Sequence, residues 1–247
     1  MESLRKQLFR SYWKAEAALV PGLTTSQHSY YLKLKSLLPG KIWLDMGCGH
    51  QVFAEWMMAE QKEVLGLCRR VYGSDLDWAG LRAHAGIPNK VFGNLEHLPF
   101  ADESFDVVSA NMVVEHLERP EIVLSEVRRC LVPGGKLIFH TPNYKGWATQ
   151  LASRFPEILK KKLIWALERR KEEDVFQTYY RMNTSEQIRE LSRQTGFGKV
   201  DIQLVSSSAV TASFGPLAIP ELLYIRRLQH PEAAERRSNV IAVLEKV

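Results

Sequence analysis

The chain has 247 residues, of which 45% are hydrophobic and 25% are charged, and its formal net charge is +5. This composition is typical of an ordinary globular protein, and the length is sufficient for one large domain with a substantial core. No apolar run approaches the roughly 20 residues that a membrane-spanning helix needs, and the first residues lack the apolar segment of a signal peptide, so we expect a cytoplasmic protein.

The cysteines are few and scattered. Cys48, Cys68 and Cys130 never form a Cys-x-x-Cys pair, so the sequence predicts neither a disulfide framework nor a cysteine zinc site. We predict no metal site.

Two helices are predicted before the first strand. Residues 1–20 place apolar side chains at helical spacing and end at Pro21-Gly22. A second helix, Ser26 to Leu38, carries Tyr30 and Tyr31 among its apolar residues and ends before Pro39-Gly40.

Residues 41–50 form the pattern around which the chain is organised. A short apolar strand runs into Asp45, and Gly47 and Gly49 follow. Glycine is needed where φ is positive or where a Cβ would block a ligand, and a helix N-terminus after the turn favours a negative group. That helix is expected over Val52 to Glu60. Asp45 can accept hydrogen bonds from a ligand, while Cys48 is interpreted as a small residue that fits the turn and not as a nucleophile.

A second acidic residue follows the next predicted strand, Arg69 to Asp75. A carboxylate at that strand end can accept hydrogen bonds from both hydroxyl groups of a ribose, and Asp75 is the candidate. A nicotinamide dehydrogenase uses similar logic, with a third glycine and an acid about 20 residues further on. Gln51 stands in place of that glycine, and Asp75 comes 28 residues after Gly47, which disfavours this class.

The middle of the chain continues the alternation of strands and helices. A helix is predicted over Trp78 to Ala85 and strands over Lys90 to Asn94, Phe105 to Asn111 and Gly135 to Thr141. The strand ending at Asn111 alternates little, as expected for a parallel strand that is buried on both faces.

His116 precedes a helix that is predicted over Glu118 to Leu131. An imidazole can remove a proton near neutral pH, so His116 is the candidate catalytic base. The alternative is a structural or ligand-orienting histidine.

Residues 145–181 are interpreted as a helical insertion. Its apolar residues recur every four positions from Trp147 to Leu163, and we expect it to cover the acceptor together with 213–227. Tyr144, Tyr180 and Arg181, at the two ends of the insertion, are then placed nearest the acceptor. A helix from Asn183 to Gln194 and strands over Val200 to Ser206 and Asn239 to Glu245 complete the chain.

Basic residues occur in four short clusters. These clusters can be solvated helix faces, or they can contact phosphates or an anionic membrane. Because they are dispersed and no nucleic-acid-binding module accompanies them, we predict no nucleic-acid partner. They are Lys160 to Lys162, Arg169 to Lys171, Arg226-Arg227 and Arg236-Arg237.

Three motifs in order carry a resemblance to a known family. Asp45-Met46-Gly47-Cys48-Gly49 resembles the first motif of class I S-adenosylmethionine-dependent methyltransferases. Asn94 to Phe100 with Ser104 to Val108, and Leu131 to Leu137, resemble the next two motifs of the branch that contains the ubiquinone and menaquinone biosynthesis enzymes. Gln51 and Asn94 depart from the family pattern, which has a third glycine and an aspartate at these positions.

The resemblance implies S-adenosylmethionine as cofactor and S-adenosylhomocysteine as product. Asn94 would contact the amine of the adenine, Leu76 and Leu95 would cover its faces, and Asn111 would border the ribose or methionine part. Helices before the first strand commonly close over the cofactor in this family, so Tyr30 or Tyr31 is either a substrate contact or a core residue. The implied cofactor-binding residues are Asp45, Gly47, Cys48, Gly49, Asp75, Leu76, Asn94, Leu95 and Asn111.

The predicted fold is α/β: a single Rossmann-like domain with a doubly wound seven-stranded sheet, N-terminal helices and a helical insertion, the last strand being antiparallel. The predicted function is methyl transfer to a small or lipid-like acceptor at oxygen or carbon, and a peripheral membrane contact is left open. A nicotinamide-dependent oxidoreductase and a regulatory module that binds the cofactor without catalysis are the alternatives.

Overall fold

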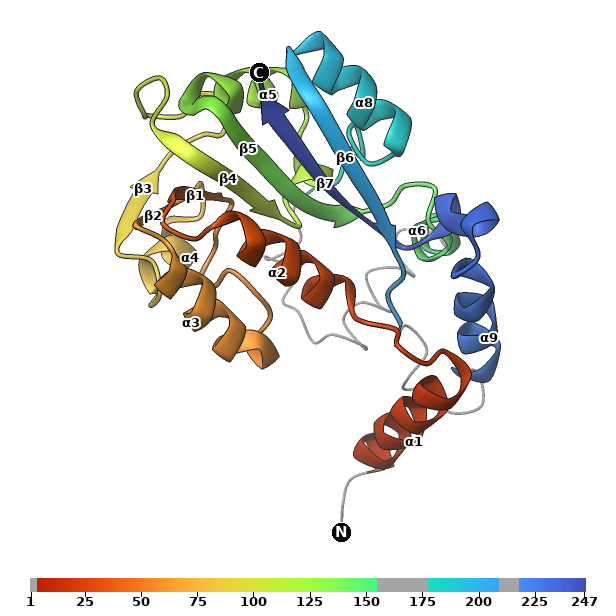
Figure 1. The fold of residues 1–247 in the computed structure, drawn as a ribbon. Helices are drawn as coiled ribbons and strands as arrows, with labels where there is room; N and C mark the ends of the chain where they lie inside the picture. The colour runs from red at the N-terminus through yellow and green to blue at the C-terminus, as the bar shows by residue number, and fades with distance from the viewer. Residues whose placement is uncertain (1–3, 155–176, 209–217) are drawn as a thin grey trace. The chain divides into compact units, whose positions relative to one another are not determined.

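One seven-stranded sheet organises the fold (Figure 1). The computed structural model describes residues 4–154, 177–208 and 218–247, and seven strands within these ranges form one sheet in the order β3-β2-β1-β4-β5-β7-β6. β1 pairs in parallel with β2 and β4, β2 with β3, and β4 with β5. In Figure 1 the arrow of β7 runs opposite to those of β5 and β6, as predicted. The bounds are β1 Ile42–Met46, β2 Arg70–Asp75, β3 Asn89–Phe92, β4 Phe105–Asn111, β5 Leu131–Pro142, β6 Phe197–Val205 and β7 Asn239–Lys246.

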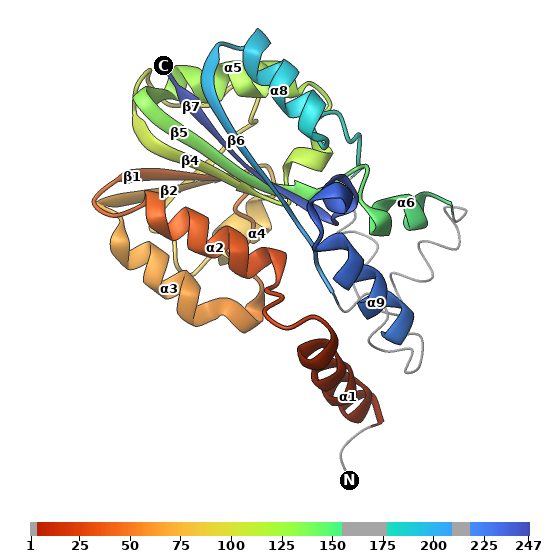
Figure 2. The same ribbon diagram turned by 45° about the vertical axis from the view of Figure 1, so that its right-hand side comes forward.

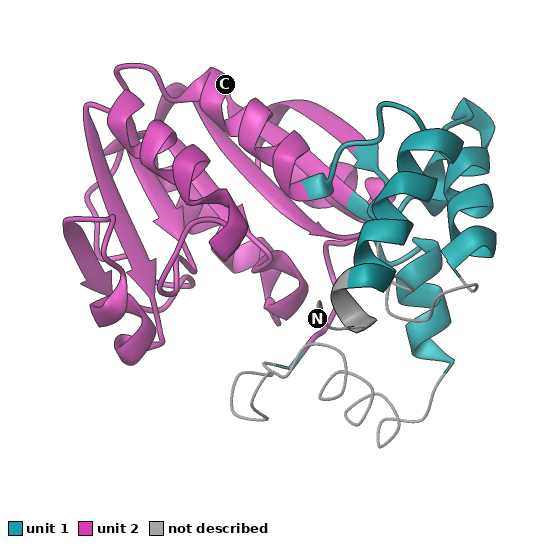
Figure 3. Cartoon of the chain, turned by 90° about the horizontal axis from the view of Figure 1, so that it is seen from below, with its two compact units in different colours: residues 1–26, 143–177, 204–239 teal, residues 27–142, 178–203, 240–247 magenta. Residues whose placement is uncertain are grey.

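The chain divides into two compact units, which Figure 3 colours separately. Unit 1 comprises residues 1–26, 143–177 and 204–239, and unit 2 comprises residues 27–142, 178–203 and 240–247. No helix in the described part of the chain has the length and apolar character needed to cross a membrane.

Helices cover both faces of the sheet in unit 2. α2, α3 and α4 lie on one face and α5 and α8 on the other (Figures 1 and 2). The strands between them are therefore buried on both sides, and Trp43, Leu44 and Val108 have no exposed surface. Thr184 caps α8 by accepting a hydrogen bond from Gln187 N. The bounds are α2 Ser26–Leu37, α3 Met58–Leu67, α4 Trp78–Ala83, α5 Pro120–Cys130 and α8 Ser185–Gln194.

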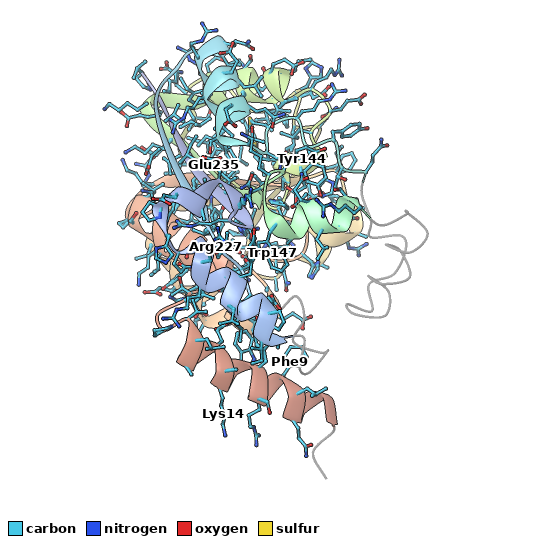
Figure 4. All side chains as sticks on the ribbon, turned by 90° about the vertical axis from the view of Figure 1, so that its right-hand side faces the viewer. Phe9, Lys14, Tyr144, Trp147, Arg227 and Glu235 are labelled. Carbon is cyan, nitrogen blue, oxygen red and sulfur yellow. The ribbon has the colours of Figure 1, made fainter. Side chains whose placement is uncertain are left out.

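The described part of unit 1 consists mainly of helices. It contains α1 (Leu4–Leu19), α6 (Trp147–Ser153), α9 (Ala218–Leu228) and the short 3-10 helix η5 (Pro231–Arg236). Apolar side chains of α1 and α9 form a separate core, and Figure 4 shows Phe9 pointing toward α9 and Lys14 pointing away from it. The buried members of this α1–α9 core are Tyr12, Val20, Ala218, Leu222 and Ile225.

The helix after the glycine turn does not begin where the sequence predicts. Residues 50–54 are not helical, the 3-10 helix η1 covers Glu55–Met57, and α3 follows. Val52 and Phe53 are buried, and their N–H groups donate to Gln61 Oε1 at 2.8 and 3.4 Å. These N–H groups are therefore held by a side chain of α3, and the predicted helix start at Val52 is wrong, whereas the end of the predicted range, Met58 to Glu60, lies in α3.

Other boundaries shift by a few residues. β3 ends at Phe92 and not at Asn94, and α5 begins at Pro120, whose missing N–H and fixed φ suit the first helical position. Of the predicted insertion 145–181, residues 155–176 lie outside the described residues. Residues 209–217 also lie outside them, so the second predicted cover is described only in α9.

Candidate functional site

The glycine turn lies at the point of the sheet where the strand order reverses. The strands after β1 extend the sheet on one side as β2 and β3 and then on the other side as β4 and β5, so the strand order reverses at β1. The carboxyl end of such a strand is the usual ligand position in these sheets. Gly47 and Gly49 have φ values of +63° and +48°, and Gly47 N donates to Ser74 O at 2.7 Å. A Cβ on Gly47 would lie 2.4 Å from Val113 Cγ2, whereas a Cβ on Gly49 would meet no atom within 4 Å. Gly47 is thus required by packing, and the space over Gly49 is open to a ligand.

Asp75 ties the end of β2 to this turn. Its Oδ2 accepts from Gly49 N and its Oδ1 from Asp77 N, both at 2.7 Å. Each carboxylate oxygen has a second acceptor position, so Asp75 can hold the turn and still accept hydrogen bonds from ligand hydroxyl groups.

Large apolar side chains are exposed at the neighbouring strand ends. Leu76 is 57% exposed, and Trp78 and Phe92 are 57% and 56% exposed with their rings packed edge to face at 6.2 Å. Asn94 is exposed and its Oδ1 accepts from Glu96 N at 3.0 Å, while Leu95 is half-buried. The edge therefore offers apolar surface to a flat ring. The sequence analysis missed Trp78 and Phe92 as site candidates, although each stands at or just after a strand end.

Asp45 points into the protein. It is 2% exposed, and Ser109 Oγ, which itself accepts from Trp43 Nε1 at 2.7 Å, donates to Asp45 Oδ1 at 2.5 Å. Burial raises the pKa of the Asp45 carboxyl to about 7, with a smaller contribution from the charge of Asp75. Tyr30 is completely buried, and burial together with the charge of Asp45 holds the pKa of its hydroxyl well above the usual range. Substrate contact by Tyr30 stays a prediction.

Asn111 joins three segments around the turn. Its Nδ2 donates to Val52 O at 2.9 Å and to Gln27 Oε1 at 3.1 Å, and its Oδ1 lies 2.9 Å from His140 Nδ1 and 3.3 Å from Gln27 Nε2. Both amide protons and both acceptor positions are thus in use. In this arrangement the Asn111 side chain positions the turn, and a direct ligand contact would require it to release a partner.

His140 was not predicted from the sequence. Its ring stacks on Tyr30 with centroids 5.6 Å apart, and burial lowers the pKa of His140 to about 4, so the imidazole is neutral at physiological pH. The only sequence signal was its place at the end of a predicted buried strand.

His116 ends the short 3-10 helix η2 (Val114–His116), and its side chain is 31% exposed. Its Nε2 lies 4.0 Å from Oε1 of Glu115, whose carboxyl is buried and has its pKa raised by that burial. Glu115 Oε2 accepts from Thr141 Oγ1 at 2.8 Å, and Thr141 Oγ1 accepts from Asn183 Nδ2 at 2.7 Å. A chain of buried hydrogen bonds therefore fixes the segment that carries His116.

Two of the predicted substrate residues lie beside this segment. The N–H groups of Tyr179 and Tyr180 donate to Glu115 O, and Arg181 Nη1 donates to Glu118 O at 2.7 Å. Tyr180 has φ +52°, an uncommon value for a residue other than glycine. Tyr144 belongs to unit 1, where its side chain is 43% exposed.

Cys48 is 3% exposed, and burial raises the pKa of its thiol, so the side chain is a packing residue and not an activated nucleophile.

Residues 44–139 match the family model described as a methyltransferase domain. A Mycolicibacterium smegmatis protein named as an S-adenosylmethionine-dependent methyltransferase is 33% identical over 133 residues, which are 50% of this chain and 49% of that protein. The ubiquinone biosynthesis O-methyltransferase of Klebsiella pneumoniae is 30% identical over 146 residues, which are 57% of this chain and 60% of that enzyme. The chain thus spans about half to three fifths of the length of these relatives.

Solved structures share the fold. A crystal structure of an S-adenosylmethionine-dependent methyltransferase from Thermotoga maritima superposes with a TM-score of 0.56, covering 98% of this chain and all of that chain at 16% identity.

Proposed function

We propose that the chain is a class I, S-adenosylmethionine-dependent methyltransferase and that it transfers a methyl group from this cofactor to a small or lipid-like acceptor. Oxygen is the first candidate acceptor atom, because one similar enzyme is named an O-methyltransferase, and carbon is the second.

One observation carries the proposal: the glycine turn, the Asp75 carboxylate and exposed apolar side chains meet at the carboxyl edge of one sheet. The open space over Gly49 and the remaining acceptor positions of Asp75 fit a ribose and its attached chain. Leu76 and Leu95, which the sequence predicted, fit the faces of an adenine. Phe92, which the sequence did not predict, fits them as well. Gly47, Cys48 and Asn94 remain proposed residues of the cofactor site, and Asn111 and Asp45 are proposed to act through the segments that they hold.

The main task of the protein in this reaction is to align the acceptor with the cofactor. When bound, the cofactor supplies a methyl group on a sulfonium, and its leaving thioether needs no proton, so alignment of the acceptor can supply much of the rate. His116 removes a proton from an alcohol, phenol or carbon acid. Tyr180 and Arg181, which are fixed on the same segment as His116, orient the acceptor.

Binding measurements separate this function from a nicotinamide oxidoreductase. Titration calorimetry should detect S-adenosylhomocysteine and no NAD, and the reverse result would support the oxidoreductase. A regulatory module would bind S-adenosylhomocysteine but would not transfer methyl groups. Incubating the protein and labelled S-adenosylmethionine with extracts of the source cell tests this point, and labelled small molecules or lipids should appear only with active protein.

A further inference from the structure

One arginine from each of two pairs that are separate in the sequence lines the same pocket of unit 1. The pocket has a volume of about 640 Å³, within the range of small-molecule sites, and lies between the end of α9 and η5. One member of each pair, Arg227 and Arg236, lines it. The remaining lining residues are Tyr224, Leu228, His230, Pro231, Glu232 and Ala233.

The pocket wall is fixed by the second member of one pair. Arg237 donates to three backbone carbonyl groups: Nε to Leu228 O at 2.8 Å, Nη1 to Leu204 O at 3.0 Å and Nη2 to Gln229 O at 3.0 Å. These bonds hold the end of α9 against the end of β6. They also cover carbonyl groups at the helix C-terminus, whose partial negative charge would otherwise oppose an anion.

The lining arginines are differently placed. Arg227 and Arg236 are exposed, and neither forms an ion pair or a side-chain hydrogen bond within the described residues. The lining residues include these two guanidinium groups, the imidazole of His230 and one carboxylate, that of Glu232. The charge of the pocket lining is therefore positive. Guanidinium groups match phosphate oxygens with two parallel hydrogen bonds.

The rest of the lining is apolar. Leu228 is 1% exposed, and the ring of Tyr224 packs edge to face on Trp147 of α6 at 6.0 Å; Figure 4 shows Trp147 beside α9. The pocket therefore combines a fixed apolar wall with two guanidinium groups that have no ion-pair or hydrogen-bond partner among the described residues.

We propose that this pocket binds the phosphate group of an organic phosphate, with the phosphate held by Arg227 and Arg236 and the carbon part on Leu228 and Tyr224. The site belongs wholly to unit 1 and is independent of the proposed methyl transfer. The phosphate can come from a soluble metabolite or from a phospholipid headgroup.

Binding to the full chain tests the proposal with two kinds of probe. Glycerol 3-phosphate serves as the soluble probe in titration calorimetry, and phosphatidylcholine vesicles with and without phosphatidylglycerol serve as the lipid probe in flotation. Arg227→Ala and Arg236→Ala should each weaken binding of the effective probe about tenfold or more, which is the loss of a charge-assisted contact. Arg226→Ala is the matched control, because Arg226 is the exposed neighbour that does not line the pocket.

Saturable binding of glycerol 3-phosphate that depends on Arg227 and Arg236 would support a soluble ligand, and the same dependence with anionic vesicles alone would support a phospholipid. Failure of both probes to bind would overturn the proposal, as would equal losses in the Arg226 and Arg227 variants, which indicate only general attraction by positive charge. Circular dichroism melting of each variant checks that it is folded; in the described part of the chain neither lining arginine forms an ion pair or a side-chain hydrogen bond.

Discussion

At the scale of single residues, the site is built from polar groups whose partners lie far away in the chain. Asp45 is held by Ser109, and Asn111 is held by Gln27, Val52 and His140. Asp75, in contrast, accepts hydrogen bonds from Gly49 N in the glycine turn and from Asp77 N, and it retains acceptor positions for a ligand. Substitutions should therefore distinguish a residue that contacts the cofactor, such as Asp75, from residues that position the surrounding segments.

Asp75→Ala should weaken S-adenosylhomocysteine binding by tenfold or more, because charge-assisted hydrogen bonds of about 1.5–3 kcal/mol each are removed. Calorimetry measures the loss. Asp77→Ala is the control: Asp77 caps α4 by accepting from Ala79 N at 3.0 Å, so this change should cost about 1 kcal/mol of stability and leave the affinity nearly unchanged. Equal affinities for the wild type and the Asp75 variant would contradict the ribose contact.

His116→Asn should lower turnover about 100-fold, the usual lower range for loss of a general base, while the dissociation constant of S-adenosylhomocysteine changes little. Steady-state kinetics with an acceptor found in the extract assay, together with calorimetry, provide both numbers. Wild-type turnover of the variant would exclude His116 as the catalytic base and would leave a structural role for it.

Asp45→Asn should change the pH dependence of stability. The pKa of Asp45 is about 7 in the folded protein and 3.8 for a free carboxyl, so the folded state binds the proton more tightly between these values. Its stabilising contribution is complete below about pH 4 and is lost as the pH rises through 7. The amide keeps an acceptor for Ser109 and carries no charge. The variant should therefore gain up to about 4 kcal/mol relative to the wild type between pH 4 and pH 8.

Urea unfolding at a series of pH values measures this difference. Asp201→Asn on β6 is the control, because Asp201 is a surface residue paired with Lys33 and its replacement should change stability by less than about 1 kcal/mol. A constant difference between wild type and the Asp45 variant across the pH range would contradict the prediction.

At the scale of elements, short segments carry the site and longer helices carry the packing. η2 places His116 and is fixed through Glu115 to β5, to Asn183 and to the backbone of Tyr179 and Tyr180. The α1–α9 core, by contrast, gathers apolar side chains from two helices that are far apart in the chain. Its stability therefore depends on how well the buried side chains fill space.

Leu222→Ala should destabilise this core by about 2–5 kcal/mol, because the side chain is completely buried and a cavity would remain. The adjacent Leu223 is 50% exposed, so Leu223→Ala should cost less than about 0.5 kcal/mol. Hydrogen exchange of the α1 and α9 amides measures both effects. Equal protection in the two variants would show that α9 does not pack as described.

At the scale of the whole molecule, the two compact units divide the proposed functions. The glycine turn, Asp75, Asn111 and His116 all belong to unit 2, while the arginine-lined pocket belongs to unit 1. The chain passes between the units several times, so each unit is assembled from distant segments.

S-adenosylhomocysteine should therefore increase hydrogen-exchange protection mainly in unit 2, around residues 45–52, 74–78 and 92–95, because a ligand stabilises the states that contain its site. Amides of residues 218–239 in unit 1 should change little. If protection rose equally in both units, they would open together and the division would not hold in solution.

The sequence by itself predicted the order of strands and helices from local signals: apolar runs, the glycines after the first strand, and acidic or amide residues at strand ends. The seven-stranded sheet was expected from the resemblance of three motifs to a methyltransferase family. Asp45, Asp75, Asn94 and Asn111 were predicted to lie along one edge because the carboxyl ends of parallel strands meet there. β4, which contains residues 105–111, was predicted to the residue.

Only the tertiary structure decided what each side chain does at that edge. Hydrophobic periodicity indicates burial but does not identify a hydrogen-bond partner, so neither Ser109 below Asp45 nor Gln27 beside Asn111 could be predicted. The start of α3 likewise depends on Gln61, which binds the N–H groups of Val52 and Phe53 before a helix can form. The meeting of Arg227 and Arg236 in one pocket follows from the turn between α9 and η5, which Arg237 holds through carbonyl groups of β6 and α9.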